Sequence, residues 1–146
     1  MKNESSQITN KILEPELSYD VQGAAYNVSN KYGSGLKEHI YQKALTEELK
    51  QRGLEFEEQK RISIYSFDTG RVLGTYVPDF VVADKIIIEI KAIPFTTEQA
   101  IDQQRSYLRA SKYEIAYLTN FGTPSVDVKR SIFTNDRKPF IALLNS

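Results

Sequence analysis

Two carboxylates and one amine lie close together in the sequence, on segments that we expect to be adjacent strands. Asp79 belongs to Tyr76-Val77-Pro78-Asp79-Phe80, and Glu89 and Lys91 belong to Ile87-Ile88-Glu89-Ile90-Lys91. Because side chains alternate along a pleated strand, Glu89 and Lys91 share one face. Mg²⁺ usually takes one or two protein carboxylates and keeps several waters. Asp79 and Glu89 would therefore suffice to hold Mg²⁺, with Lys91 beside it to orient water or neutralise a phosphate during phosphodiester cleavage.

An ordinary explanation stands beside this one, because charged residues often form the solvated tips of strands and short motifs match many proteins by chance. Two neighbouring features favour a site. Pro78 lacks a backbone N–H, and prolines within sheets mark edges or bulges, which often redirect side chains near active sites. Ile86 to Ile88 form a branched apolar run typical of a strand covered on both faces, so Glu89 and Lys91 follow where burial should persist. Buried charges require a partner or a metal.

Helical spacing of apolar residues predicts three helices around these strands. The first begins near Leu17 and ends before residues 31–35. Ser34 is the expected N-cap of the second helix, which Gly53 ends. Thr96 or Thr97 is the expected cap of the third helix, over residues 98–110. The apolar stripe predicted for the second helix is Leu36, Ile40, Ala44, Leu45 and Leu49.

Alternating and apolar runs predict a sheet in which a hairpin leads into the strand that carries Glu89. A tight turn at Ala83-Asp84 makes the first connections antiparallel, whereas a right-handed helical crossover makes the next strand parallel. We expect a hairpin whose two extended segments, Glu55 to Tyr65 and the run that reaches Val82, are joined by a turn over Ser66 to Gly70. Further extended segments are expected over Lys85 to Ala92, Lys112 to Thr119 and, as an edge strand, Val126 to Phe133.

Composition limits the classes of protein that the chain can represent. Its 146 residues suit one domain with equal numbers of acidic and basic residues, so any phosphate-binding surface must be local. The absence of cysteine excludes disulfides and thiolate metal sites, and the single histidine, His39, excludes a multi-histidine zinc site. We expect a flexible tail over residues 1–16, one domain over 17–146, no membrane association and a cytoplasmic location.

Several short motifs complete a recognisable set. Gly35-Leu36-Lys37-Glu38-His39-Ile40-Tyr41 has the pattern G-x-x-E-x-x-Y, and it is joined by Pro78-Asp79, Glu89-Ile90-Lys91 and Gln103-x-x-x-Tyr107. The chain resembles the GxxExxY family of the PD-(D/E)xK nuclease superfamily from about Leu17 to Phe133. The resemblance implies an α/β (α+β) fold with a restriction-endonuclease-like core, a mixed sheet of about four or five strands flanked by helices.

The same resemblance implies a role for each motif residue. Glu38, Asp79 and Glu89 would bind the metal together with the backbone carbonyl of Ile90, and Lys91 would assist catalysis. Gln103 and Tyr107 would support the site or meet nucleic acid, as Tyr41 would if it is more than a packing residue. Ordinary explanations remain open, because an acid at a helix start also complements the helix dipole and aromatic rings at helical spacing normally serve the core.

We therefore expect a nuclease that depends on Mg²⁺, or on Mn²⁺ in its place, and that hydrolyses phosphodiester bonds of nucleic acid, with DNA as the expected substrate. The alternative is a non-catalytic nucleic-acid-binding or assembly module that keeps the fold. A partner protein or a homo-oligomer would supply specificity that so small and neutral a chain lacks. Basic residues on the second and third helices either approach a phosphate backbone or form solvated faces: Lys37, Lys43, Arg105, Arg109 and Lys112.

Overall fold

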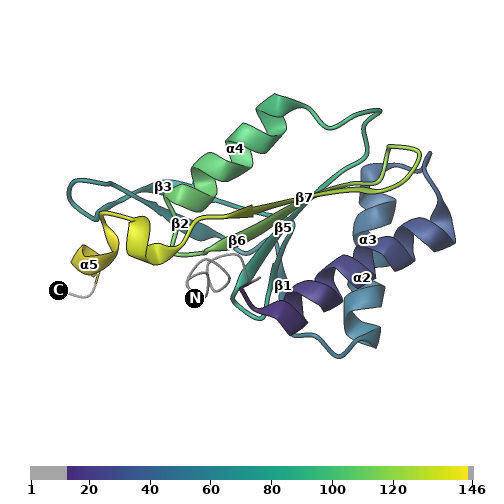
Figure 1. Cartoon of the computed structure of the whole chain (residues 1–146), viewed down its shortest axis with the longest axis horizontal. Coiled ribbons are helices and arrows are strands. Elements are labelled where there is room, and N and C mark those ends of the chain that lie inside the picture. The colour runs from purple at the N-terminus through teal and green to yellow at the C-terminus, as the bar shows by residue number, and fades with distance from the viewer. Residues whose placement is uncertain (1–12, 145–146) are drawn as a thin grey trace, which may run out of the picture.

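A five-stranded mixed sheet forms the centre of the protein in a computed structural model that describes residues 13–144 (Figure 1). Its strand order is β1-β4-β5-β6-β7, and only β5 and β6 run parallel. The expected mixed sheet flanked by helices is therefore confirmed. The strands are β1 (Phe56–Glu58), β4 (Phe80–Val82), β5 (Ile86–Lys91), β6 (Ile115–Asn120) and β7 (Asp127–Ile132).

Helices cover both faces of this sheet. In Figure 1, α4 (Glu98–Arg109) lies above it, and α2 (Pro15–Tyr32) and α3 (Glu38–Gln51) lie below it. The strands β5 and β6 are apolar along most of their length because both of their faces are buried. Ile88 and Ile90 pack toward α2 and α3, whereas Ile87 packs with Leu108 of α4. The helix α4 forms the expected crossover between the parallel strands β5 and β6.

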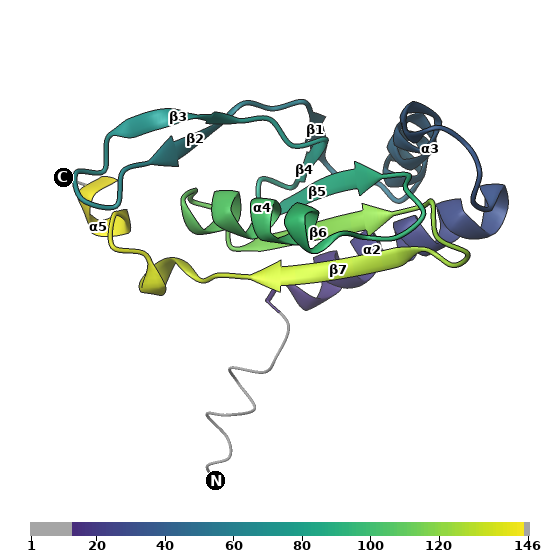
Figure 2. The ribbon, with the colours of Figure 1, turned by 90° about the horizontal axis from the view of Figure 1, so that it is seen from above.

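The hairpin stands apart from the central sheet, which corrects part of the predicted strand pattern. Its strands β2 (Ile62–Tyr65) and β3 (Val72–Tyr76) form a separate two-stranded sheet (Figure 2). The two extended segments predicted for the hairpin are each divided into two strands, β1 and β2 in the first and β3 and β4 in the second. Gln59 has a left-handed φ of 56°, which separates β1 from β2. Pro78, which has no N–H, lies in the break between β3 and β4.

The helix boundaries are close to those expected, but one cap and part of one stripe are wrong. Thr97 caps α4 and accepts a hydrogen bond from the Ala100 N–H. The N-cap position of α3 is Lys37, which makes no side-chain cap, so Ser34 does not cap this helix. The buried side of α3 differs from the predicted apolar stripe, because Leu36 and Ile40 are exposed whereas Tyr41 is buried.

The rest of the described chain is short. It contains a 3₁₀ turn, η1 (Asn135–Arg137), and the helix α5 (Ile141–Leu144). Most of the predicted tail, residues 1–16, lies outside the described residues. No helix within residues 13–144 has both the length and the apolar character needed to cross a membrane.

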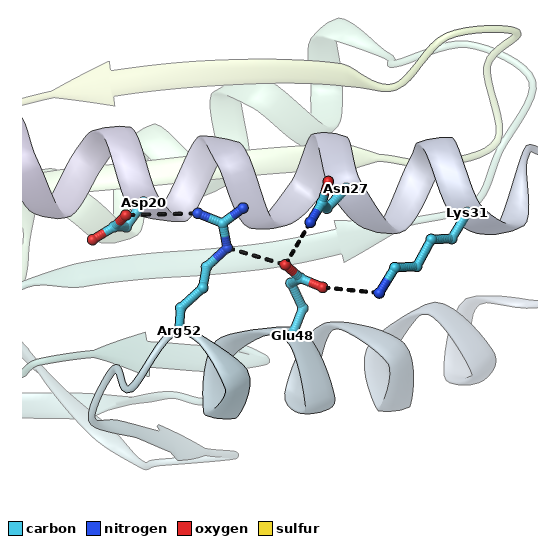
Figure 3. Close-up of polar contacts among 5 residues, drawn as sticks. All are labelled: Asp20, Asn27, Lys31, Glu48 and Arg52. Carbon is cyan, nitrogen blue, oxygen red and sulfur yellow. Dashed lines mark hydrogen bonds and ion pairs between the residues drawn. The ribbon is translucent and has the colours of Figure 1, made fainter.

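A buried acid joins the two helices that cover the lower face. Glu48 of α3 is only 5% exposed and accepts hydrogen bonds from Asn27 Nδ2 at 2.8 Å and Arg52 Nε at 3.1 Å (Figure 3). Its other oxygen lies 3.5 Å from Lys31 Nζ, and Arg52 also reaches Asp20 at 3.6 Å. The Asn27 hydrogen bond, aided by Arg52 and Lys31, lowers the pKa of Glu48 despite its burial. This network holds α2 against α3.

We expect Glu48→Ala to destabilise the protein by about 2 kcal/mol at neutral pH, because it removes the charge-assisted hydrogen bonds that this buried carboxylate accepts from α2 and from Arg52. The lowered pKa of Glu48 means that its contribution is present above the ordinary glutamate pKa and is lost as the pH falls through the folded-state value. Urea denaturation at neutral and acidic pH should therefore show a difference between wild type and variant that shrinks in acid. The exposed neighbour Glu47 supplies the control Glu47→Ala, and an equal loss in that variant would contradict the assignment.

Candidate functional site

Asp79 lies where the pairing of β4 with β5 stops. The last pair in the register is Phe80 with Ile88, and continuing it outward would place Pro78 opposite Ile90. Proline has no N–H to donate to the Ile90 carbonyl, so the ladder cannot be completed there. The Ile90 N–H donates to Asp79 Oδ2 at 2.7 Å. The Asp79 side chain is half-buried there. The broken ladder thus turns a carboxylate toward the end of β5, as the proline in the sequence indicated.

Glu89 is held by a residue that the sequence analysis missed. Tyr76, the last residue of β3, donates its hydroxyl to Glu89 Oε1 at 2.5 Å. The Tyr76 ring stacks on Tyr107 of α4, with ring centroids 4.2 Å apart and planes 8° from parallel. Local spacing carries no signal for this contact, because the break at Pro78 leaves Tyr76 in the two-stranded sheet, whereas the chain after Asp79 enters the central sheet.

Lys91 shares a small cavity with Glu89. The cavity has a volume of about 190 Å³ and lies between β5, the end of β3 and α4. Gln103 and Tyr107, the predicted supporting pair, both line it. The structure therefore brings the Q-x-x-x-Y motif of α4 to the same space as the strand acid and amine. The neighbouring Gln104 is buried and serves the fold instead, because its side chain donates to the Tyr117 carbonyl at 3.0 Å.

The acids at this strand end are poorly compensated. Burial raises the pKa of Glu89 to about 7, with Asp79 and Glu38 adding to the rise, although the Tyr76 hydrogen bond and Lys91 oppose it. Burial likewise raises the pKa of Asp79, against the Ile90 N–H, Gln59 and Lys91. Within residues 13–144, no basic side chain forms an ion pair with Asp79 or Glu89.

This donor set fits a hard divalent cation. Two half-buried carboxylates form no ion pair with any side chain of residues 13–144, and Mg²⁺ needs no more than one or two carboxylates. The Ile90 carbonyl, which is also a predicted ligand, belongs to the residue whose N–H holds Asp79. A cation here would offset the repulsion and desolvation that raise both pKa values.

Glu38 approaches from the other side of the sheet, as the first residue of α3. It is exposed, and its pKa is raised by partial desolvation and by the charge of Asp79, with Lys91 opposing. Glu38 is therefore within electrostatic range of the cluster. Across residues 13–144, however, no three His, Cys, Asp or Glu side chains lie close enough to form a metal-ligand group. Asp79 and Glu89 form the central pair, and a ligand role for Glu38 remains a prediction.

Tyr41 fixes the loop that leads into Glu38. Its hydroxyl donates to the Gly33 carbonyl at 2.5 Å and accepts from the Leu36 N–H at 3.2 Å. Its ring is fully buried and stacks on Phe121 with centroids 4.7 Å apart. Gly35 between these contacts has a φ of 118°, which a side chain would strain. The glycine and tyrosine of G-x-x-E-x-x-Y thus shape the turn that places the glutamate.

The segment Asn120-Phe121-Gly122 fixes the other end of the site. The Phe121 N–H donates to the Lys91 carbonyl at 2.8 Å, and buried Asn120 accepts from the Ile93 N–H at 3.1 Å. Gly122 lies so close to the Ile93 backbone that a Cβ would clash with it. These contacts clamp the chain immediately after Lys91. The sequence analysis gave this segment no role in the site, and an Asn and a Gly two residues apart were the available signal.

Together the fold and this cluster define an α+β protein with an acidic, lysine-bearing site at the end of its central sheet. The family model described as the PD-(D/E)XK nuclease superfamily matches residues 15–131, and the chain belongs to that superfamily. An alkaline exonuclease from Laribacter hongkongensis is similar in structure, with a TM-score of 0.47 and 12% identity over 87% of this chain and 73% of that one. No curated protein matches the sequence.

We expect Tyr41→Phe to loosen the turn before Glu38 while leaving the core packed. The variant keeps the ring stack on Phe121 but loses the hydroxyl that joins Gly33 to Leu36. Stability should fall by about 1 kcal/mol, the usual net contribution of such hydrogen bonds. Amide hydrogen exchange at Leu36 should accelerate. Tyr32→Phe, at a tyrosine that is 46% exposed, is the matched control, and unchanged exchange at Leu36 in Tyr41→Phe would contradict this role.

Proposed function

We propose that this protein is a divalent-metal-dependent nuclease that hydrolyses phosphodiester bonds in DNA. The observation that carries the proposal is the meeting of Asp79, Glu89 and Lys91 at one strand end, where the two acids have raised pKa values and no ion-pair partner within residues 13–144. Membership of the nuclease superfamily supports it. The motif set further supports placing the chain in the GxxExxY family.

In this proposal Asp79, Glu89 and the Ile90 carbonyl hold Mg²⁺ or Mn²⁺, with Glu38 extending the acidic shell. A bound divalent cation would lower the pKa of water and stabilise charge on the phosphate. The Ile90 N–H orients Asp79, and Tyr76 orients Glu89, so neither carboxylate depends on the metal for its position. Such preorganisation favours catalysis because the donors need not rearrange during the reaction.

Lys91 is the proposed catalytic cation. It is half-buried in the cavity with Glu89, and its backbone is held through Phe121. From there its ammonium group can orient the attacking water or stabilise negative charge on the phosphate. Gln103 and Tyr107 support the same cavity from α4. The cytoplasmic location and the partner or homo-oligomer expected from the sequence stay predictions.

Isothermal titration calorimetry with Mn²⁺ and Mg²⁺ tests the metal site directly. We expect Asp79→Asn and Glu89→Gln each to weaken binding by about tenfold or more, because each removes one anionic ligand while keeping the side-chain shape. The exposed Asp68 in the hairpin turn supplies the control Asp68→Asn, which should bind as the wild type does. Undiminished affinity in both site variants would exclude these residues as ligands.

A cleavage assay on linear, circular and single-stranded DNA tests the role of Lys91. We expect Lys91→Ala to lower the cleavage rate by about 10²-fold to 10³-fold, as when other transition-state donors are removed, while metal binding is retained. Lys50→Ala, at an exposed lysine of α3, should cleave normally. Wild-type protein that binds metal and DNA yet leaves every substrate intact would favour the alternative, a non-catalytic binding module.

A further inference from the structure

A second and wider cavity lies on the opposite flank of α4 from the proposed catalytic site. Its volume is about 700 Å³, and it is bounded by the loop before α4, by the turn between β6 and β7, and by β7. Ile101 and Arg105 of α4 line it, one turn apart on one side of the helix. Gln103 and Tyr107, also one turn apart, line the catalytic cavity on the other side. One helix therefore separates the two spaces.

The strand register places the two spaces within reach of one substrate. Lys91 of β5 pairs with Asn120 of β6, and Asn120 pairs with Asp127 of β7, which lines the wider cavity. Because neighbouring strands lie about 4.8 Å apart, Asp127 is roughly 10 Å from Lys91 across the sheet. The two positions lie at the same end of the sheet. A flexible polymer whose phosphate lies at Lys91 can therefore place a neighbouring unit in the wider cavity.

An exposed aromatic ring stands at the rim of this cavity. Phe95 is 68% exposed, although its neighbours Thr96 and Ile101 are partly buried. The loop that carries Phe95 is anchored at both ends, by Asn120 bonded to Ile93 and by the Thr97 cap of α4. The apolar ring is thus presented on a fixed backbone. An exposed ring that is held in place can stack on another flat ring.

The polar groups of the cavity favour a neutral, hydrogen-bonding ligand over a densely charged one. Its two acids, Glu98 and Asp127, balance its two bases, Arg105 and Lys129. Asp127 is already engaged, because it accepts from Thr96 at 2.7 Å and lies 3.5 Å from Lys129 Nζ. Arg105 bonds Ser131 through Nε alone, so within residues 13–144 its other N–H groups have no protein partner. They remain available to accepting atoms of a ligand.

We propose that this cavity binds a nucleobase of a single-stranded stretch of the substrate, stacked on Phe95 and hydrogen-bonded by Arg105. This inference rests on the proposed nuclease function and narrows its substrate to single-stranded nucleic acid or to ends with an unpaired strand. A base inside a duplex has both faces covered by its neighbours and cannot stack on Phe95 without being extruded. Stacking tolerates any base, so the site adds affinity without sequence preference.

Fluorescence anisotropy with a labelled oligothymidylate of about 12 nucleotides, measured without divalent metal, tests the base site apart from cleavage. We expect Phe95→Ala to weaken binding by about tenfold, because stacking on an aromatic side chain supplies affinity of that order. Phe95→Tyr should bind within about twofold of wild type, since a flat ring remains. Tyr19→Ala, at a tyrosine of α2 that is 75% exposed, should leave binding unchanged.

Blunt duplex of the same length completes the experiment, and its affinity should be the same in wild type and Phe95→Ala. Unchanged oligothymidylate affinity in Phe95→Ala, or an equal loss for the duplex, would overturn the proposal. The binding result for Phe95 can be distinguished from the cleavage result that tests the nuclease function. Phe95-dependent binding by a protein that cleaves nothing would support the base site and reject the nuclease, whereas Lys91-dependent cleavage with Phe95-independent binding would do the reverse.

Discussion

The hydrogen bond from the Ile90 N–H to Asp79 is the interaction on which the proposed site depends. A strand that loses its neighbour leaves backbone donors without partners, and here the donor is satisfied by a carboxylate instead of by another strand. The bond therefore ends the β4–β5 ladder and places Asp79 beside Glu89 in a single step. Pro78 favours this ending, because it has no N–H to donate to the Ile90 carbonyl.

Two glutamates show how partners separate structural acids from candidate functional ones. Glu48 and Glu89 are both largely removed from solvent, yet their pKa values shift in opposite directions. Glu48 accepts from an amide, an arginine and a lysine, so its charge is stabilised and binds α2 to α3. Glu89 accepts from one hydroxyl and forms no ion pair within residues 13–144, so burial and the nearby acids outweigh Lys91 and raise its pKa. Such imbalance is typical of sites that await a cation or a substrate.

The sequence predicted the fold where the signal was local. The Thr97 cap, the parallel crossover through α4 and the edge strand near residues 126–133 follow from spacing and capping alone. Contacts between segments far apart in the sequence could not be predicted from local spacing. Nothing local shows that Tyr76, in a sheet separate from β5, would bond Glu89. Nor does it show that Tyr41 would replace Ile40 on the core-facing side of α3. Propensity describes a helix, but packing partners decide which face it buries.

The packing of α4 on the sheet positions both the proposed catalytic cavity and the proposed base-binding cavity. Buried Leu108 and the Gln104 bond to the Tyr117 carbonyl fix its position on the sheet, and the Thr97 cap fixes its start. Because the helix cannot rotate without breaking these contacts, its two flanks are held in fixed relation to Lys91. One flank closes the cavity with Glu89 and the other opens the cavity beside Phe95. A single buried face thus sets the spacing between the proposed chemistry and the proposed base-binding site.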